Sequence, residues 1–267
     1  MITRRNFIQS MMTATSGLAL AAAGLPFAAK ADETASTPLS ALLDQFFIED
    51  IKRNPERATV LGLDKGDLAD LRAKLSDRSP AGIAAAKAAT ADQLARLKKI
   101  DRASLTGMEA VNYDCVAYVL EQRDRIGKRF DFGAPWERSP YAVSQLTGSY
   151  QSIPTFLDTK HRIDGPDDIG SYLARMEAFA TALNEDTEAL NRDVGRGIVP
   201  PDFILDTTIQ QIEKLETDSD TSILLTSLHR RAKGLTPQQL DAARKIYNDK
   251  VSPALEKLWG GVKAARR

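Results

Sequence analysis

The stretch PDDIGSYLARMEAFATALNEDTEALNRDVG, residues 166–195, carries the clearest structural signal in this chain of 267 residues. Its apolar side chains recur every three or four positions, which is the spacing of one helix face. Pro166 and the acids Asp167 and Asp168 are typical of a first helical turn, and Gly195 and Gly197 are typical of an end. The apolar positions are Ile169, Tyr172, Leu173, Met176, Phe179, Leu183, Leu190 and Val194.

The same period continues outward in both directions. Residues 39–51 form a similar face, with Thr37 as N-cap, Pro38 at the first helical position and a stop at Asn54-Pro55. Further helical segments are expected at 58–66, 68–75, 80–100, 108–126, 201–216, 220–234 and 236–258, and Pro253 should kink the last one. No segment alternates for long enough to predict a sheet. The expected fold is therefore all-α, a bundle of roughly eight or nine helices.

Residues 133–165 interrupt this pattern and predict one long aromatic-rich loop. Three prolines, Pro135, Pro140 and Pro154, argue against regular helix there. A long irregular segment inside a helical protein is often functional, so its aromatic side chains could line a cleft. Alternatively, they pack the loop onto the helices, because aromatic rings have large areas to bury. The candidate cleft residues are Trp136, Tyr141, Tyr150 and Phe156.

The first thirty-one residues have the three parts of an export signal. Arg4, Arg5 and Phe7 resemble the twin-arginine type, a weakly apolar segment follows, and Ala29 and Ala31 form a small-x-small cleavage site. The expected organisation is an export signal at 1–31, a linker at 32–38 and a helical domain at 39–267. We expect the twin-arginine (Tat) translocase as a partner during export, and a periplasmic or extracellular location.

An uncleaved signal would instead anchor the chain in the membrane. A spanning helix needs about 20 strongly apolar residues. Gly17, Gly24 and Pro26 interrupt the apolar segment here. Cleavage is therefore favoured, and no stable membrane span is expected after it.

Composition excludes several functional classes. The chain balances 36 basic and 36 acidic residues, and removing Arg4, Arg5 and Lys30 with the signal leaves a net charge of −3. With no basic stripe carrying interleaved aromatics, a nucleic-acid partner is not expected. The single cysteine, Cys115, excludes an internal disulfide, and its place on an apolar helix face predicts a buried, inert thiol.

The sequence contains few groups for catalysis or metal binding. Its two histidines, His161 and His229, cannot form the His-Glu-x-x-His motif of a zinc peptidase. His229 precedes two arginines and suits a helix end. His161 lies near several aspartates, which could hold a cation. The favoured interpretation there is a turn followed by an acidic first helical turn, so we predict no catalytic and no metal residues.

Several stretches together resemble the bacterial "domain of unknown function 885" family. These are Leu43-Asp-Gln-Phe-Phe, Asn54-Pro55-Glu-Arg-Ala58-Thr-Val-Leu61-Gly62, Tyr172-Leu173-Ala-Arg175-Met176, Arg196-Gly197-Ile198-Val199-Pro200-Pro201 and Val251-Ser-Pro253-Ala254-Leu255-Glu-Lys-Leu258. The resemblance implies an exported or lipid-anchored, largely helical protein that is similar to zinc peptidases. Family members are about twice this length, and their His-Glu-x-x-x-Gly-His-type motif lies in the second half. No family catalytic residue can therefore be transferred to this chain, and zinc is expected only in the missing C-terminal half.

Two functional hypotheses follow. The first is the N-terminal half of a zinc peptidase-like protein, not catalytic alone, which should expose apolar surface where the C-terminal half docks, with Trp259 and the last helix as candidates. The second is a stand-alone periplasmic scaffold or binding protein that grips a peptide or small ligand with the residues from Trp136 to Phe156.

Overall fold

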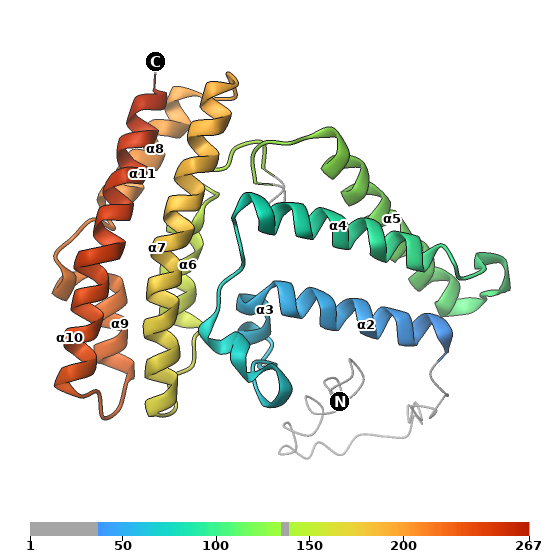
Figure 1. Ribbon diagram of the computed structural model, residues 1–267, viewed down its shortest axis with the longest axis horizontal. Coiled ribbons are helices and arrows are strands. Elements are labelled where there is room, and N and C mark those ends of the chain that lie inside the picture. Colours follow the sequence, from blue (N-terminus) through green and yellow to red (C-terminus); the bar gives the residue numbers. More distant parts are fainter. Residues whose placement is uncertain (1–36, 135–138, 267) are drawn as a thin grey trace, which may run out of the picture. The chain divides into compact units, whose positions relative to one another are not determined.

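The computed structural model describes residues 37–134 and 139–266, and its fold is all-α, as predicted (Figure 1). In these two ranges, strand-like pairing is limited to the isolated bridges Ala134–Ser139 and Ser144–Thr147. The predicted export signal, with Arg4, Arg5, Phe7, Ala29 and Ala31, lies outside the described residues. No described helix is both long and apolar enough to cross a membrane.

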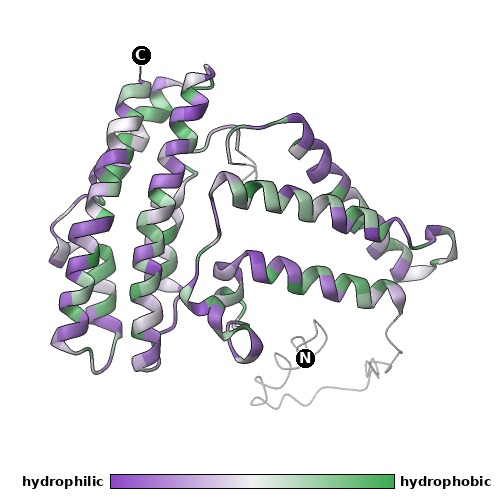
Figure 2. Ribbon diagram, in the orientation of Figure 1, coloured by the Kyte–Doolittle hydropathy of each residue, from purple (hydrophilic) through white to green (hydrophobic). Residues whose placement is uncertain are grey.

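The helices are numbered in chain order. The α-helices are α2 (Pro38–Arg53), α3 (Pro55–Val60), α4 (Pro80–Leu97), α5 (Gly107–Arg129), α6 (Ser149–Thr159), α7 (Pro166–Gly195), α8 (Asp202–Glu213), α9 (Ile223–Arg231), α10 (Pro237–Ile246) and α11 (Ser252–Ala265). Short 3₁₀ turns are η1 (Gly66–Ala73), η2 (Arg102–Ser104) and η4 (Ser219–Thr221), and η5 (Tyr247–Val251) is a π-helical turn. Along each helix, hydrophobic and hydrophilic residues alternate with the helical period (Figure 2).

The helical region divides into two compact units. One contains the described residues up to Asp50 together with Ala91–Gln122, and the other contains Ile51–Thr90 and the described residues from Arg123 onward. The first unit has a small core of its own, in which α2, α4 and α5 meet. Its buried members are Leu39, Phe46, Leu94, Leu97 and Leu120.

The second unit is built on α7, the helix that the sequence identified most clearly. The continuous rod α10–η5–α11 lies beside α7 and runs in the same direction. Two contacts show this direction: Lys250 pairs with Glu177, and further along both helices Lys257 contacts Asn184. Helices α6, α8 and α9 complete the bundle around a core that includes Tyr172, Phe179, Leu205, Leu228 and Leu258. This long bundle supports the polar network described below.

Two local expectations were wrong. Ser149–Thr159 forms helix α6 although Pro154 lies inside it, so the predicted loop at 133–165 is partly helical. Near Pro253, where a kink was predicted, the helix changes to the π-turn η5 just before the proline, and the wider turn accommodates the missing backbone N–H. Cys115, expected to be buried, is exposed.

Candidate functional site

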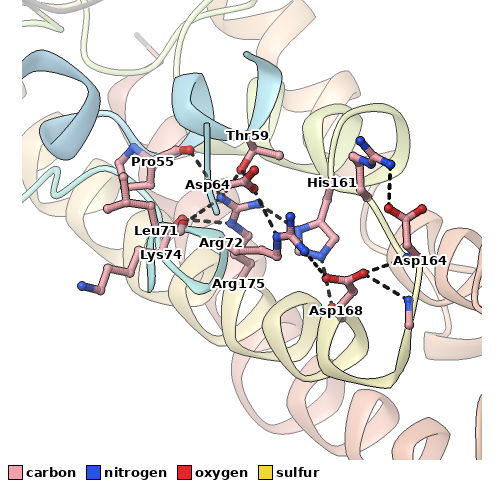
Figure 3. A network of polar contacts seen from close by, with 12 residues as sticks. Pro55, Thr59, Asp64, Leu71, Arg72, Lys74, His161, Asp164, Asp168 and Arg175 are labelled. Carbon is pink, nitrogen blue, oxygen red and sulfur yellow. Dashed lines mark hydrogen bonds and ion pairs between the residues drawn. The ribbon is translucent and has the colours of Figure 1, made fainter. Parts of the chain in front are cut away.

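The most unusual side chain of the second unit is Arg175, which is fully buried on the core-facing side of α7. Burying a charge is costly unless its donors are all used. Nε donates to the carbonyl of Lys74 (2.9 Å), and Nη2 donates to the carbonyl of Leu71 (3.1 Å) and the hydroxyl of Thr59 (2.7 Å). Nη1 lies 2.8 Å from Nδ1 of His161. Helix α7 is thereby tied to α3, η1 and the α6–α7 connection (Figure 3).

Arg175 also contacts two further groups. The carbonyl of Pro55 lies 3.5 Å from Nη2, and the ring of Phe156 lies 4.9 Å from the guanidinium carbon. A cation over an aromatic face gains electrostatic energy when both are away from water. Burial still lowers the pKa of Arg175 to about 10, so the side chain keeps its charge at neutral pH.

The network continues through carboxylates at its edge. Thr59 accepts from Arg175 and donates to Asp64 (2.8 Å), which lies 3.5 Å from Nε of Arg72. Arg72 in turn pairs with Asp168 at 2.5 Å. Asp64 and Asp168 are both buried. Each buried carboxylate therefore has a cation or hydroxyl as partner, which is the condition for keeping it inside.

Asp168 also fixes the start of α7. Its Oδ2 accepts from the backbone N–H groups of Asp164 (2.8 Å) and Gly165 (3.1 Å). Burial alone would raise the pKa of Asp168, but these hydrogen bonds and Arg72 hold it below the usual value. The acidic first turn that the sequence predicted thus caps α7 through Asp168.

His161 is held in one neutral form. Because Arg175 can only donate, Nδ1 of His161 must accept, and Nε2 then carries the proton toward the carbonyl of Asp168 (3.2 Å). Burial, and next the charge of Arg175, lower the pKa of His161 to about 4. Both ring nitrogens are occupied, so the interpretation of His161 as a cation ligand does not fit its surroundings.

Arg231, at the end of α9, closes the other side of this region. Its guanidinium donates to the carbonyls of Leu157 and Asp158 (both 2.6 Å) and to that of His161. The last carbonyls of a helix have no partner within it, so a cation there completes the C-terminus of α6. His229 lies in the last turn of α9 and is exposed, as the helix-end interpretation expected.

This arrangement positions helices, because its charged groups are engaged by one another and by backbone groups. Among the residues that the structure describes, no three His, Cys, Asp or Glu side chains gather closely enough to hold a metal ion. The buried side-chain atoms without a partner in the described ranges are Gln145 Oε1 and Ser149 Oγ. Neither belongs to the Arg175 network.

Two of the four aromatic residues proposed to line a cleft lie in the core. Tyr150 and Phe156 are buried, and the Tyr150 hydroxyl lies 2.7 Å from the carbonyl of Ser144 and 2.8 Å from Oε1 of Gln211. Tyr141 is half-buried, and Trp136 lies outside the described residues. The placement of Tyr150 and Phe156 agrees with the alternative that these side chains pack their segment onto the helices.

An open groove of about 750 Å³ runs between α7 and the η5–α11 segment. Small side chains such as Ala174, Ala178 and Ala254 form its floor. Charged groups on its edge pair with each other, as Lys250 does with Glu177 at 2.7 Å. Lys250 and Glu177 therefore neutralise each other and do not offer a free charge to a ligand in the groove.

The sequence analysis did not identify Arg175 as the centre of a network. A signal was present, because Arg175 lies three residues after Tyr172 and one before Met176, within the apolar face of α7. A long charged side chain at such a position must either reach solvent or meet buried acceptors. The sequence cannot show where those acceptors come from.

Comparison with known proteins identifies the family. Residues 55–266 match the family described as "Bacterial protein of unknown function (DUF885)". The chain belongs to this family. The whole Arg175 network lies inside the DUF885 match, and so do both histidines of the chain. No curated protein matches the chain.

A solved structure shares the DUF885 chain's fold. It is "The crystal structure of the putative lipoprotein from Colwellia psychrerythraea", with a TM-score of 0.70 at 16% sequence identity. The similarity covers 87% of this chain and 43% of that one. The chain thus spans less than half the length of this structural neighbour.

Proposed function

We propose that this chain is the exported, helical N-terminal half of a zinc peptidase-like protein, and that it is not catalytic without a second, metal-binding half. The observation that carries the proposal is the coverage: a DUF885 chain shares its fold with 43% of a longer protein. The proposed export is supported by the twin-arginine pattern at Arg4 and Arg5 and by the lipoprotein description of that neighbour.

The described residues do not fit a zinc ion. Zinc in peptidases takes three protein ligands, usually histidine and carboxylate. No such cluster exists in the described ranges, and His161 faces the guanidinium of Arg175. We therefore assign no catalytic step to this chain and propose that its role is to form and support one side of a composite site.

The DNA downstream of this coding sequence provides the first test. We expect an in-frame or neighbouring segment that encodes a His-Glu-x-x-x-Gly-His helix. Co-expression of that segment with this chain should give a complex that hydrolyses peptides in the presence of zinc, whereas each part alone should not. Absence of such a segment, or a complex without zinc-dependent hydrolysis, would refute the proposal.

A second candidate function is that of a stand-alone periplasmic binding or scaffold protein. The groove between α7 and the η5–α11 segment favours it, because its volume of about 750 Å³ is within the usual size of ligand sites. A thermal melt with and without a mixture of short peptides tests this function. Replacement of Ala178 by Trp should fill the groove and abolish any stabilisation by peptide; an unchanged melting temperature for the wild type would exclude peptide binding.

A further inference from the structure

Helix α5 has apolar side chains on two of its faces. One face packs into the core of the first unit through Ala110 and Leu120, with Tyr113, Val116 and Ala117 beside them. A surface helix needs only one such face, and a helix that is apolar all round is normally buried. The second face therefore needs an explanation.

The second face is an exposed apolar stripe, formed by Met108, Val111, Cys115, Tyr118 and Val119 on successive turns of α5. The exposed fractions are 70% for Met108, 50% for Val111, 65% for Tyr118 and 40% for Val119, and Cys115 is also exposed. All five lie within the first unit and inside the DUF885 match. Isolated exposed apolar residues are ordinary, but a contiguous row of them on one helix marks an interaction site.

The charges beside the stripe are already paired within the first unit. Asp114 receives two hydrogen bonds from Arg102, at 2.6 and 2.7 Å, and Glu121 pairs with Lys98 at 2.9 Å. Because each of these two acids is paired with a base, the two pairs add no strong net charge along the stripe. A matching partner surface should accordingly be apolar, which is the character of permanent interfaces.

The surface that the sequence suggested for docking is less exposed. Trp259 on α11 is half-buried against the core of the second unit. Its indole N–H donates to Glu213 (3.1 Å), and Lys263 covers its ring at 4.0 Å. Helix α11 buries its apolar residues against α7 and α8, so the exposed stripe of α5 is the stronger candidate.

We propose that the α5 stripe is the docking surface for the second half of the DUF885 protein, an inference that rests on the proposed function. More than half of the structural neighbour's chain lies outside its match with this one, so a polypeptide of that size is available to cover an apolar face of the shared fold. Side chains at this spacing form a ridge of the kind that packs against a second helix. Its occupant is therefore a polypeptide with a complementary apolar helix.

The single cysteine of the chain makes the stripe directly testable. The separately expressed downstream polypeptide is added to the full chain, and the reaction of Cys115 with a thiol reagent such as dithionitrobenzoate is followed. Docking should slow the reaction at least about tenfold, because a covered thiol is inaccessible. Tyr118→Glu should weaken the complex at least about tenfold. Phe203→Glu, at a 71% exposed aromatic on α8, is the matched control and should leave affinity unchanged.

The possible outcomes separate the two proposals. Binding to the wild type with an unprotected Cys115 and an unaffected Tyr118→Glu variant would overturn the docking surface and leave the proposed function standing. No binding to the wild type would overturn both. A Cys115 that is already protected in the chain alone, with a dimeric mass by light scattering, would assign the stripe to a second copy and overturn the proposal. Thermal melts of both variants verify that each one folds.

Discussion

At the scale of single residues, Arg175 shows how a buried charge can be kept without a carboxylate directly against it. Its donors meet backbone carbonyls, a hydroxyl and an imidazole, all of them neutral. The acids Glu56 and Asp64 act on it at longer range and raise its pKa, against the larger effect of burial. The neutral partners fix its position, and each would lose a hydrogen bond if the guanidinium were lost.

Replacement of Arg175 by Lys tests this role. Lysine keeps the positive charge, but it lacks the planar, forked guanidinium with which arginine reaches acceptors in several directions. We expect a loss of about 3 kcal/mol in the free energy of unfolding, measured by urea denaturation. Arg266→Lys, at an exposed pair with Asp206, should change it by less than about 0.5 kcal/mol. Equal stability of the two variants would contradict the structural role of Arg175.

The pKa of His161 predicts how stability depends on pH. In the unfolded chain this imidazole titrates near 6.5, and in the folded protein near 4. Between these values the unfolded state binds the extra proton, so stability is complete above pH 6.5 and falls as pH decreases toward 4. The His161 contribution to this loss is about 3 kcal/mol, since each unit of pKa corresponds to about 1.4 kcal/mol.

His161→Gln isolates this contribution. Glutamine can still accept from Arg175 and donate to the carbonyl of Asp168, but it does not titrate. Urea unfolding of the wild type and the variant should be compared at pH 7 and pH 4.5. We expect the variant to lose clearly less stability over this interval, and parallel losses in both proteins would show that His161 is not the group responsible.

The residue-scale network lies beyond what a single sequence can predict. The hydrogen bond between Arg175 and Thr59 joins positions 116 residues apart. Periodicity places Arg175 on the apolar face of a helix, but no local pattern names its partners. The acids near His161 were similarly open to two interpretations, because proximity in sequence does not reveal that Arg72 and two backbone N–H groups engage Asp168.

At the scale of elements, the helical period predicted the helices reliably, whereas interruptions of the period predicted loops less reliably. Helix α7 spans the predicted residues, and α2 begins at the predicted proline. Helix α6 was missed because Pro154 and neighbouring prolines suggested a loop, although tertiary packing of Tyr150, Ile153 and Leu157 favours a helix. The period also showed an apolar face on α5 but could not show whether another element covers it.

The segment between α5 and α6 offers a test at this scale. Gly133 has a φ of +72°, and a Cβ there would lie 2.5 Å from the carbonyl oxygen of Ser139, while its N–H donates to Asp193 (2.8 Å). Gly133→Ala must therefore shift backbone that joins this segment to α7. We expect a cost of at least about 2 kcal/mol in the free energy of unfolding.

Gly170→Ala is the matched control for this substitution. Gly170 lies inside α7, is exposed, and has open space where a Cβ would be. Alanine there should raise the free energy of unfolding by about 0.5–1 kcal/mol, because it restricts the unfolded chain and favours helix. If both alanine variants were equally stable in chemical denaturation, the close contact at Gly133 would not constrain the fold.

At the scale of the whole molecule, two units with separate cores form a chain that matches part of a longer protein. Composition and periodicity predicted the all-α class, and the motif resemblance predicted the family. They could not locate the exposed apolar surface, because exposure depends on which helix faces meet. The structure leaves Trp259 on the last helix half-buried and exposes the apolar stripe of α5.

The exposed stripe predicts a measurable property of the isolated chain. Dyes such as anilinonaphthalene sulfonate fluoresce when they bind exposed apolar surface, and folded monomers usually offer little of it. The double variant Val111→Ser/Tyr118→Ser should lose most of the dye fluorescence of the folded wild type, because it interrupts the stripe at two positions about two turns apart. Phe203→Ser removes one exposed aromatic outside the stripe and should lose little. Equal losses in both variants would mean that the dye binds exposed apolar residues in general, and the α5 stripe would not be a distinct surface.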